Sequence, residues 1–196
     1  MAYDEIKSSG VTESTPGNIL FGAGTFHVGL AYDSDSGEWN FSDSVIGATT
    51  GGGVLTITPE ITNLEVDGAL VKMKGLAIKT GETATIQTTL AEITPDILKN
   101  MLIADEQESE IAEGYNELVS RDILEDGDYL ENFAYVGKRI DGTPLIILFE
   151  QCLCATGFSA TAQNKTVASS TVTFECYADL QAEGTSLPYH IIYPAS

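Results

Sequence analysis

The chain has 196 residues, of which 43% are hydrophobic and 19% charged, and this length and composition are typical of a globular protein with a sizeable core. Its 29 acidic residues outnumber its 9 basic residues and give a net charge of -20, which excludes binding to nucleic acids or anionic lipids through clustered lysine and arginine. No apolar run is long enough to span a membrane and the first residues lack a signal-peptide pattern, so we expect synthesis in a cytoplasm.

The first 20 residues are polar and irregular, and their Gly and Pro residues predict an N-terminal arm. After short apolar stretches between Leu20 and Leu30, the acidic run from Asp33 to Gly37 predicts a loop. Its spacing is close to that of a calcium loop, but Ser44 stands in place of the bidentate glutamate. We therefore favour an ordinary turn over a calcium site.

The glycine-rich stretch 47–53 allows two interpretations. Glycine and threonine between strands are typical of a flexible turn at the end of a hairpin. Such a turn can also become ordered against a partner subunit. From the residues alone we favour the flexible turn.

Alternation of apolar and polar residues predicts a β-meander between residues 53 and 92. Pro59 interrupts the first strand, and Asp67-Gly68 and Thr80-Gly81 are turn dipeptides. The apolar phase changes at Gly75, where we expect a β-bulge. The expected strands comprise residues 55–58, 61–66, 70–79 and 83–90.

A helix is predicted to begin after Thr94, because Thr caps free amides, Pro95 suits the first helical position and Asp96 lies at the positive end of the dipole. An apolar stripe at helical spacing then indicates a face that packs on the core. The stripe consists of Ile97, Leu98, Met101 and Leu102.

Residues 104–131 contain 11 acidic residues and one basic residue, Arg121. Such a charge run is typical of solvated chain. We expect a long acidic excursion between the helix and the remaining strands.

The remaining strands follow this excursion. Asp141-Gly142 predicts the turn of a hairpin formed by residues 132–139 and 143–149, and the aliphatic run of the second strand predicts burial on both faces. We expect residues 152–162 to continue as a strand, and Val172, Phe174 and Cys176 to point inward from another. Residues 181–196, with two prolines, are predicted to form a second arm.

About eight strands, one helix and two arms predict a mainly β protein: an antiparallel β-sandwich or barrel with one flanking helix. We expect a single domain over residues 1–196, with arms at 1–20 and 181–196 and the acidic excursion at 104–131.

Catalytic templates fit this sequence poorly. Gly53 stands where a phosphate-binding loop needs lysine, and His27 stands where a dinucleotide fingerprint needs its third glycine. His27 and His190 are the only histidines and neither lies in a catalytic motif, so we expect packed or surface residues. The three cysteines lack further ligands at metal-binding spacing, and we expect reduced, packed thiols.

Several stretches of the chain resemble the tail tube proteins, or major tail proteins, of long-tailed phages and prophages of Gram-positive bacteria. The resemblance is carried by Phe21-Gly22-Ala23-Gly24-Thr25-Phe26-His27-Val28-Gly29, by Ile46 to Gly52, and above all by Ile57-Thr58-Pro59-Glu60-Ile61-Thr62-Asn63-Leu64-Glu65-Val66-Asp67-Gly68-Ala69. It continues through residues 71–76, 82–85 and 90–94, and covers about residues 20 to 100.

The resemblance implies a non-enzymatic structural subunit that forms hexameric rings, which stack into the tube for genome passage. The fold is also similar to tubes of contractile bacteriocins and type VI secretion. It implies residence in the virion, with the tape measure, tail terminator and distal tail proteins as partners. From the sequence we expect no cofactor, no metal and no membrane partner. Contact with passing DNA would be transient and non-specific, and we expect a wall of like charge to keep phosphates from binding.

We predict assembly contacts in three regions: the arm around residues 21–27, the glycines at 51–53 and the acidic excursion. The candidate residues are Phe21, Gly22, Gly24, His27, Gly51, Gly52, Gly53, Asp105, Glu106 and Glu108. Two alternatives remain open at this point. One is a distal tail or baseplate ring protein of the same fold, and the other is a monomeric β-barrel that binds a small apolar ligand.

Overall fold

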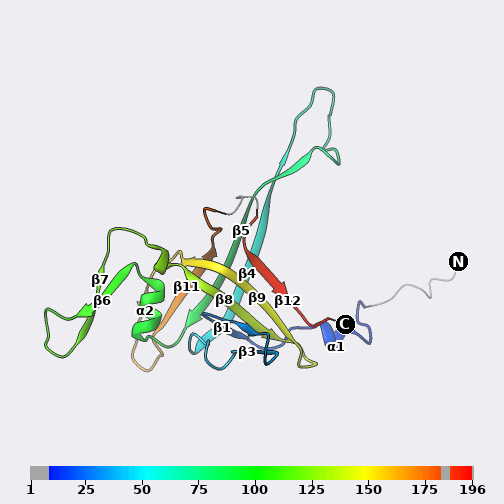
Figure 1. Ribbon diagram of the computed structural model, residues 1–196. Helices are drawn as coiled ribbons and strands as arrows, with labels where there is room; N and C mark the ends of the chain where they lie inside the picture. Colours follow the sequence, from blue (N-terminus) through cyan, green and yellow to red (C-terminus); the bar gives the residue numbers. More distant parts are fainter. Residues whose placement is uncertain (1–8, 182–185, 196) are drawn as a thin grey trace.

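The computed structural model describes residues 9–181 and 186–195 (Figure 1). Among the described residues 45% lie in strands and 8% in helices, which confirms the mainly β class. All strand pairs are antiparallel. A main sheet has the strand order β1-β8-β9-β11-β5-β4, with β10 paired to β11 and β12 paired to β9.

The strands of the main sheet are β1 (Thr25–His27), β4 (Thr49–Asn63), β5 (Ala77–Leu90), β8 (Leu130–Lys138), β9 (Pro144–Cys154), β10 (Ala160–Thr161), β11 (Ser169–Cys176) and β12 (Tyr189–Ile192). Two small hairpins pair β2 (Tyr32–Asp33) with β3 (Glu38–Trp39) and β6 (Ala104–Glu108) with β7 (Asn116–Ser120). The helices are α1 (Thr15–Asn18), α2 (Pro95–Met101) and the 3-10 turn η1 (Asp126–Asp128).

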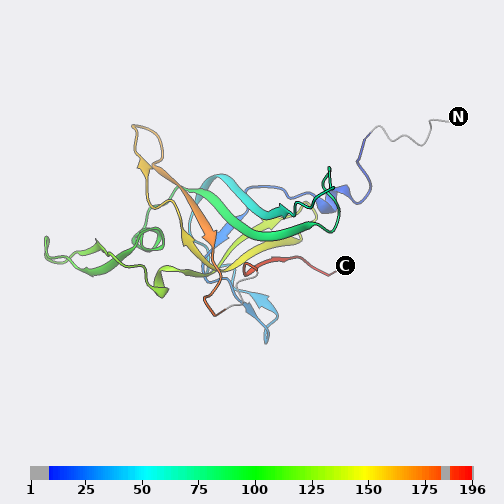
Figure 2. The ribbon, with the colours of Figure 1, turned by 90° about the horizontal axis from the view of Figure 1, so that it is seen from above.

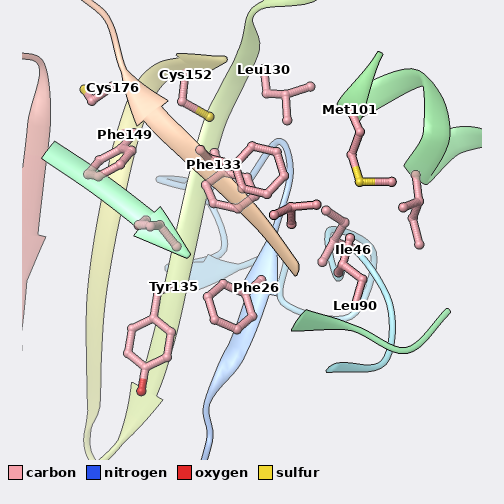
Figure 3. Packing of buried hydrophobic residues seen from close by; sticks show 14 of the residues in the cluster. Phe26, Ile46, Leu90, Met101, Leu130, Phe133, Tyr135, Phe149, Cys152 and Cys176 are labelled. Atoms are coloured by element: carbon pink, nitrogen blue, oxygen red, sulfur yellow. The ribbon is translucent and has the colours of Figure 1, made fainter. Parts of the chain in front are cut away.

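The main sheet curls around a core of phenylalanines (Figure 3). Phe26, Phe133, Phe149 and Phe174 are fully buried, and the rings of Phe133 and Phe174 lie 4.2 Å apart. The curl brings β4 and β1 together, although they lie at opposite ends of the strand order: a Cβ built on Gly53 would lie 2.4 Å from Cζ of Phe26. Large side chains therefore fill the interior of the curled sheet.

The β8–β9 hairpin has the predicted turn and the predicted two-faced burial. Asp141 accepts hydrogen bonds from the backbone and hydroxyl of Thr143, which fixes the turn. In β9, Phe149 packs in the main core, while Ile146 and Leu148 pack in a second cluster on the opposite face. Trp39 and Phe41 pack against this second cluster from outside the main sheet.

Helix α2 begins and packs as its sequence predicts. The hydroxyl of Thr94 accepts a hydrogen bond from the backbone N–H of Ile97 at 3.3 Å, which caps the helix. Ile97 and Met101 are buried in the main core, and Figure 3 shows Met101 entering the cluster from one side, near Ile46 and Leu90. The helix therefore covers one end of the core.

The predicted meander is wrong in the number and the ends of its strands. One strand, β4, runs through Pro59, and one strand, β5, runs through Thr80 and Gly81. β4 is the outermost strand in the order, where proline is tolerated because an N–H on the outer side has no strand to bond. The bulge predicted at Gly75 lies instead at Thr80, the extra residue between the pairs Glu60–Gly81 and Ile61–Lys79.

Two predicted irregular segments are also wrong in part. The acidic excursion occupies the predicted place, but it contains the β6–β7 hairpin and η1 rather than only loop. In the predicted C-terminal arm, β12 pairs with β9 and so belongs to the main sheet. Residues 182–185 and 196 of that arm, and 1–8 of the N-terminal arm, lie outside the described residues.

The described part of the N-terminal arm is mostly exposed but fastened to the body. Backbone hydrogen bonds join Phe21 to Lys138 and Ile140 to Ile19. These bonds hold the end of the arm against the β8–β9 hairpin.

The inward face of β11 is confirmed, whereas the strand predicted for 152–162 ends at Cys154 and resumes only as the short β10. Val172 and Phe174 are fully buried and Cys176 is 4% exposed. Cys176 lies opposite Cys152 on β9, and all three cysteines are free thiols. Burial raises the pKa of Cys176 to about 12 and also raises that of Cys152, so neither thiol forms a reactive thiolate at neutral pH.

Candidate assembly surfaces

The β4–β5 hairpin projects from the body of the molecule and ends in an exposed apolar loop (Figure 1). We call residues 64–76, which join the two strands, the apolar tip. Leu70 is 97% exposed and Val71 is 74% exposed. The other exposed apolar side chains of the tip are Leu64, Val66 and Met73. Exposed apolar side chains that gather in one segment are typical of interaction surfaces.

Local backbone contacts shape the apolar tip. Its base is closed by a hydrogen bond from the N–H of Leu64 to the carbonyl of Leu76, at 2.7 Å. Two turns inside it are closed by hydrogen bonds from Ala69 to Val66 and from Leu76 to Met73. The loop thus has a defined course without burying its apolar residues.

The charged residues of the apolar tip and its C-terminal flank are mixed in sign. Between Gly68 and Gly81 the sequence holds three lysines and no acidic residue. Lys79 pairs with Glu82 at 2.8 Å, whereas Lys72 and Lys74 form no ion pair within the described residues. The tip also contains the exposed residues Glu65 and Asp67, so its formal charge is zero.

The β6–β7 hairpin, residues 104–120, is here called the acidic hairpin. Its strands are held by cross-strand side-chain bonds more than by burial: Glu117 accepts hydrogen bonds from Gln107 at 3.0 Å and from Ser109 at 2.9 Å. These bonds lower the pKa of Glu117, so its carboxylate stays charged at neutral pH. Glu106 pairs with Lys99 of α2, and this bond lowers the pKa of Glu106.

Arg121 fixes the base of the acidic hairpin. Its guanidinium bonds to Asp105 at 2.8 Å, to Glu125 at 3.0 Å and to both carboxylate oxygens of Asp128. The side chains of Arg121 and Asp128 are 17% and 10% exposed. Arg121, the one basic residue of the predicted excursion, therefore pairs with carboxylates of the excursion itself. The acidic residues of the excursion that do not contact Arg121 or Lys99 form no ion pair within the described residues.

A hollow of about 600 Å³ lies between α2 and the acidic hairpin. We call it the acidic groove. It is lined by the apolar or aromatic residues Pro95, Leu98, Tyr115 and Leu118, by the acidic residues Glu106 and Glu117, and by Gly114 and Asn116. Between Pro95 and Leu118 the chain holds seven acidic residues and one basic residue. The groove is suited to a partner that is apolar and basic.

The predicted contact residues of segment 21–27 differ in exposure: some lie at the surface and others pack within the chain. Phe21 is 76% exposed, and a Cβ added to Gly22 would meet nothing within 4 Å, so both are available at the surface. Gly24 has φ of +71°, and a Cβ there would lie 2.4 Å from the ring of Tyr135. Gly24 thus serves packing within the chain.

His27 is 1% exposed and also serves the fold of the single chain. Its Nδ1 lies 2.9 Å from Oγ of Ser44, and its Nε2 lies 2.8 Å from Oγ1 of Thr25. Ser44 donates its hydroxyl hydrogen to the carbonyl of Asn40 at 2.9 Å, so the imidazole Nδ1–H donates to the serine oxygen. A serine hydroxyl bound in this way is not activated as a nucleophile.

The glycines at 51–53 lie within β4, so the flexible turn that we favoured is wrong. Thr50 pairs with Thr89 and Gly53 pairs with Thr88, which leaves Gly51 and Gly52 as extra residues of a bulge. Both have φ near +75°, a conformation that glycine adopts without strain. Gly51 and Gly53 are both exposed at this edge strand, and a Cβ added to Gly53 would meet the ring of Phe26.

The acidic candidates all lie on β6. Asp105 and Glu106 are engaged by Arg121 and Lys99, whereas Glu108 is exposed. The acidic loop at 33–37 is a turn, in which the Asp33 carboxylate accepts hydrogen bonds from Asp35 at 2.9 Å and Ser36 at 2.7 Å. Within the part of the chain that the structure describes, no cluster of three metal-binding side chains occurs.

The apolar tip is the feature that sequence reasoning missed, because its residues were assigned to strands. The available signal was the loss of a single apolar face over residues 61–73. A strand that packs one face on a core shows strict alternation, which this segment lacks.

The chain matches no known protein-family model, and no curated protein matches it. Among the described residues, no helix has the length and hydropathy needed to cross a membrane.

Proposed function

We propose that this chain is a non-enzymatic structural subunit that assembles into hexameric rings, stacked as the tail tube of a long-tailed phage or prophage. The observation that carries the proposal is the projecting β4–β5 hairpin with its exposed apolar tip. A lone subunit leaves this apolar surface in water, whereas assembly covers it. The resemblance of residues 20 to 100 to tail tube proteins supports the same function.

The edge of the main sheet gives independent support for self-association. Within residues 9–181 and 186–195, no strand pairs with the outer edge of β4, which is 15 residues long. A long unpaired edge offers backbone N–H and carbonyl groups to another chain. In a closed ring each subunit supplies such an edge to its neighbour, so the exposed edges disappear.

The charge of the chain suits a conduit for DNA. A net charge of -20 leaves few basic residues that could bind phosphates. Two of these basic residues, Lys99 and Arg121, are already paired with carboxylates. A wall of like charge repels a passing polyanion and prevents it from binding. In this proposal the tape measure, tail terminator and distal tail proteins are the other partners.

The small-ligand barrel is disfavoured by the packing of the core. Four phenylalanines at 0% exposure fill the space that such a ligand would need. The distal ring protein differs from the tube subunit only in that its rings do not stack.

Negative-stain microscopy of the purified protein over a concentration series tests the proposal. Salt should be raised, because it screens the repulsion between chains of charge -20. We expect rings and stacked tubes with a central hole that increase with concentration. Single rings that never stack would favour the distal ring protein. Compact monomers at every concentration and salt, even with an added tail-tip complex, would contradict the proposal.

A further inference from the structure

We propose that Cys152 and Cys176 are an oxidation site, at which a small-molecule disulfide such as oxidised glutathione converts the two thiols into a bridge between β9 and β11. The two residues lie directly opposite each other on these neighbouring strands. Both are free thiols in the structure. The inference concerns the single chain and does not depend on the proposed assembly.

The strands β9 and β11 join the two halves of the main sheet. In the strand order, β1, β8 and β9 lie on one side of this junction, and β11, β5 and β4 lie on the other. The paired part consists of the last three residues of each strand, 152–154 and 174–176. Figure 2 shows the end of β11 meeting β9 near the centre of the molecule. A bridge between Cys152 and Cys176 would therefore fasten a short junction of the sheet.

The register gives the two cysteines the spacing that a disulfide needs. In the next pair along the ladder, the N–H of Tyr177 donates to the carbonyl of Gln151 at 3.1 Å. Because hydrogen-bonded and non-hydrogen-bonded pairs alternate in an antiparallel ladder, Cys152 and Cys176 form a non-hydrogen-bonded pair. The Cα atoms of such a pair lie about 4.5 Å apart, which is within the range of about 4.4–6.8 Å that disulfides span.

The side chains need only rotate to form the bridge. Figure 3 shows the two cysteines on neighbouring strands, with their sulfur atoms turned in opposite directions. Residues directly opposite each other in a ladder have their Cβ atoms on the same face of the sheet. Rotation about the Cα–Cβ bond of each cysteine, from one staggered position to another, therefore brings the sulfur atoms together without a shift of the backbone.

Cys154 is a poorer partner for either thiol. It lies opposite Phe174 rather than opposite a cysteine. Along β9 it is two residues from Cys152, which separates the Cα atoms by about 6.6 Å. Across the ladder it is diagonal to Cys176, at a separation of about 7–8 Å. Both separations are near or beyond the upper end of the disulfide range, so the register selects one of the three possible pairs.

The oxidation is a thiol–disulfide exchange in two steps. The thiolate of Cys176 attacks one sulfur of the small disulfide, so that a mixed disulfide forms and one small thiolate leaves. The thiolate of Cys152 then attacks the sulfur of Cys176, and the second small thiolate leaves. The leaving thiolates take up the two protons that the cysteines lose. Two electrons pass from the protein to the oxidant, which becomes two thiols.

Burial makes this oxidation slow. Cys152 is fully buried and Cys176 is 4% exposed, so the oxidant reaches the sulfur atoms when the end of β11 opens locally. Burial also raises the pKa of both thiols, that of Cys176 to about 12, which keeps thiolate scarce at neutral pH. The thiols therefore stay reduced in a cytoplasm, whereas long exposure to oxidant outside a cell allows the bridge to form.

Mass spectrometry of the full chain tests the inference. The protein is incubated with oxidised glutathione at about pH 8.5, where thiolate is more abundant than at neutral pH, and is then quenched with acid and digested with trypsin. Trypsin cleaves after Lys165, which lies between the two cysteines in the sequence. We expect peptide 140–165 to be linked to peptide 166–196, and fragmentation of the linked pair should place the link at Cys152.

Two variants of β9 form a matched pair, because each removes one thiol from the same face of the strand. Cys154→Ala should form the link as wild type does, whereas Cys152→Ala should form none. The rate of linking in wild type should rise about tenfold between pH 7 and pH 8, because thiolate increases tenfold per pH unit below the pKa.

The bridge should also stabilise the fold. Bridged protein should have a Tm about 5–10 °C above that of reduced protein, because a link that encloses residues 153–175 restricts the unfolded chain. Adding a thiol reductant should return the Tm to its original value. An unchanged or lower Tm would contradict a bridge that the native register accommodates.

The outcomes separate the inference from the proposed function. Chains that stay reduced for about a day at pH 8.5, or a link that uses Cys154, would overturn the inference whether or not tubes form. Links between two chains rather than within one would overturn it as well. A bridged chain that never forms rings would leave the inference and contradict the tube.

Discussion

Gly53 shows how a single residue allows the sheet to curl. A Cβ at this position would lie 2.4 Å from Cζ of Phe26 and 3.1 Å from the carbonyl oxygen of Gln87, and neither the buried ring nor the backbone can move freely. We expect Gly53→Ala to lower the free energy of unfolding by about 1–3 kcal/mol, because it overpacks the contact between β4 and β1.

Urea unfolding measures this effect, and Gly10→Ala is the matched control. A Cβ at Gly10 would meet nothing within 4 Å, so that variant should unfold like wild type. Equal stability of the two variants would mean that β4 does not pack on Phe26.

His27 makes the stability of the fold depend on pH. Burial lowers the pKa of His27 below its ordinary 6.5, so below pH 6.5 the unfolded chain binds a proton that the folded chain does not. The contribution of His27 to stability is therefore complete above pH 6.5 and is lost as the pH falls toward its folded pKa.

An NMR titration of the His27 ring in the wild-type protein measures this directly. We expect a midpoint below 6.5, and a smaller loss of stability on acidification in His27→Gln than in wild type. A midpoint at or above 6.5 would contradict the buried, neutral imidazole that bonds Ser44 and Thr25.

Predictions for single residues were confirmed where the alternation of side chains along one strand is sufficient to tell which of them are buried. Val172, Phe174 and Cys176 were predicted to point inward, and a two-residue period is sufficient for that. The packing of Gly53 on Phe26 was not predictable, because it arises from the curl of a sheet whose end strands are distant in the strand order.

At the scale of the element, α2 depends on its cap. Thr94 is exposed, and its hydroxyl accepts the hydrogen bond from Ile97, so Thr94→Ala removes the cap without removing buried contacts. We expect a loss of about 1 kcal/mol in the free energy of unfolding. Thr94→Ser keeps the hydroxyl and should retain most of the stability in the same urea experiment; a loss as large as that of Thr94→Ala would exclude capping as the cause.

Elements with a strong local sequence pattern were predictable. Elements that depend on long-range strand pairing or on bonds between polar side chains were not. The Asp141-Gly142 turn and the aliphatic run of β9 were sufficient for the β8–β9 hairpin. Thr80-Gly81 has the composition of a turn, but pairing along the whole of β4 keeps it within β5 as a bulge. The acidic hairpin gives no apolar alternation, because bonds of Glu117 and Arg121 stabilise it instead of burial.

The same reasoning explains how far the candidate surfaces could be predicted. The acidic excursion was predicted from its charge, and its role as a contact region was expected from the resemblance to tail tube proteins. The groove beside it needs the position of α2, and the apolar tip needs the true ends of β4 and β5. Both depend on tertiary pairing rather than on local pattern.

At the scale of the whole molecule, two opposing properties govern association. A net charge of -20 keeps copies apart, whereas the apolar tip and the free edge of β4 favour contact. Assembly should therefore require that salt or a template overcome the repulsion. This balance would keep subunits dispersed until a tail is built.

The central claim is that these copies form stacked hexameric rings around a channel, and cryo-electron microscopy of end-on views of the assemblies at raised salt tests it most directly. The account predicts a sixfold wall around an open central hole. Solid filaments without a channel, or monomers under every condition, would contradict it.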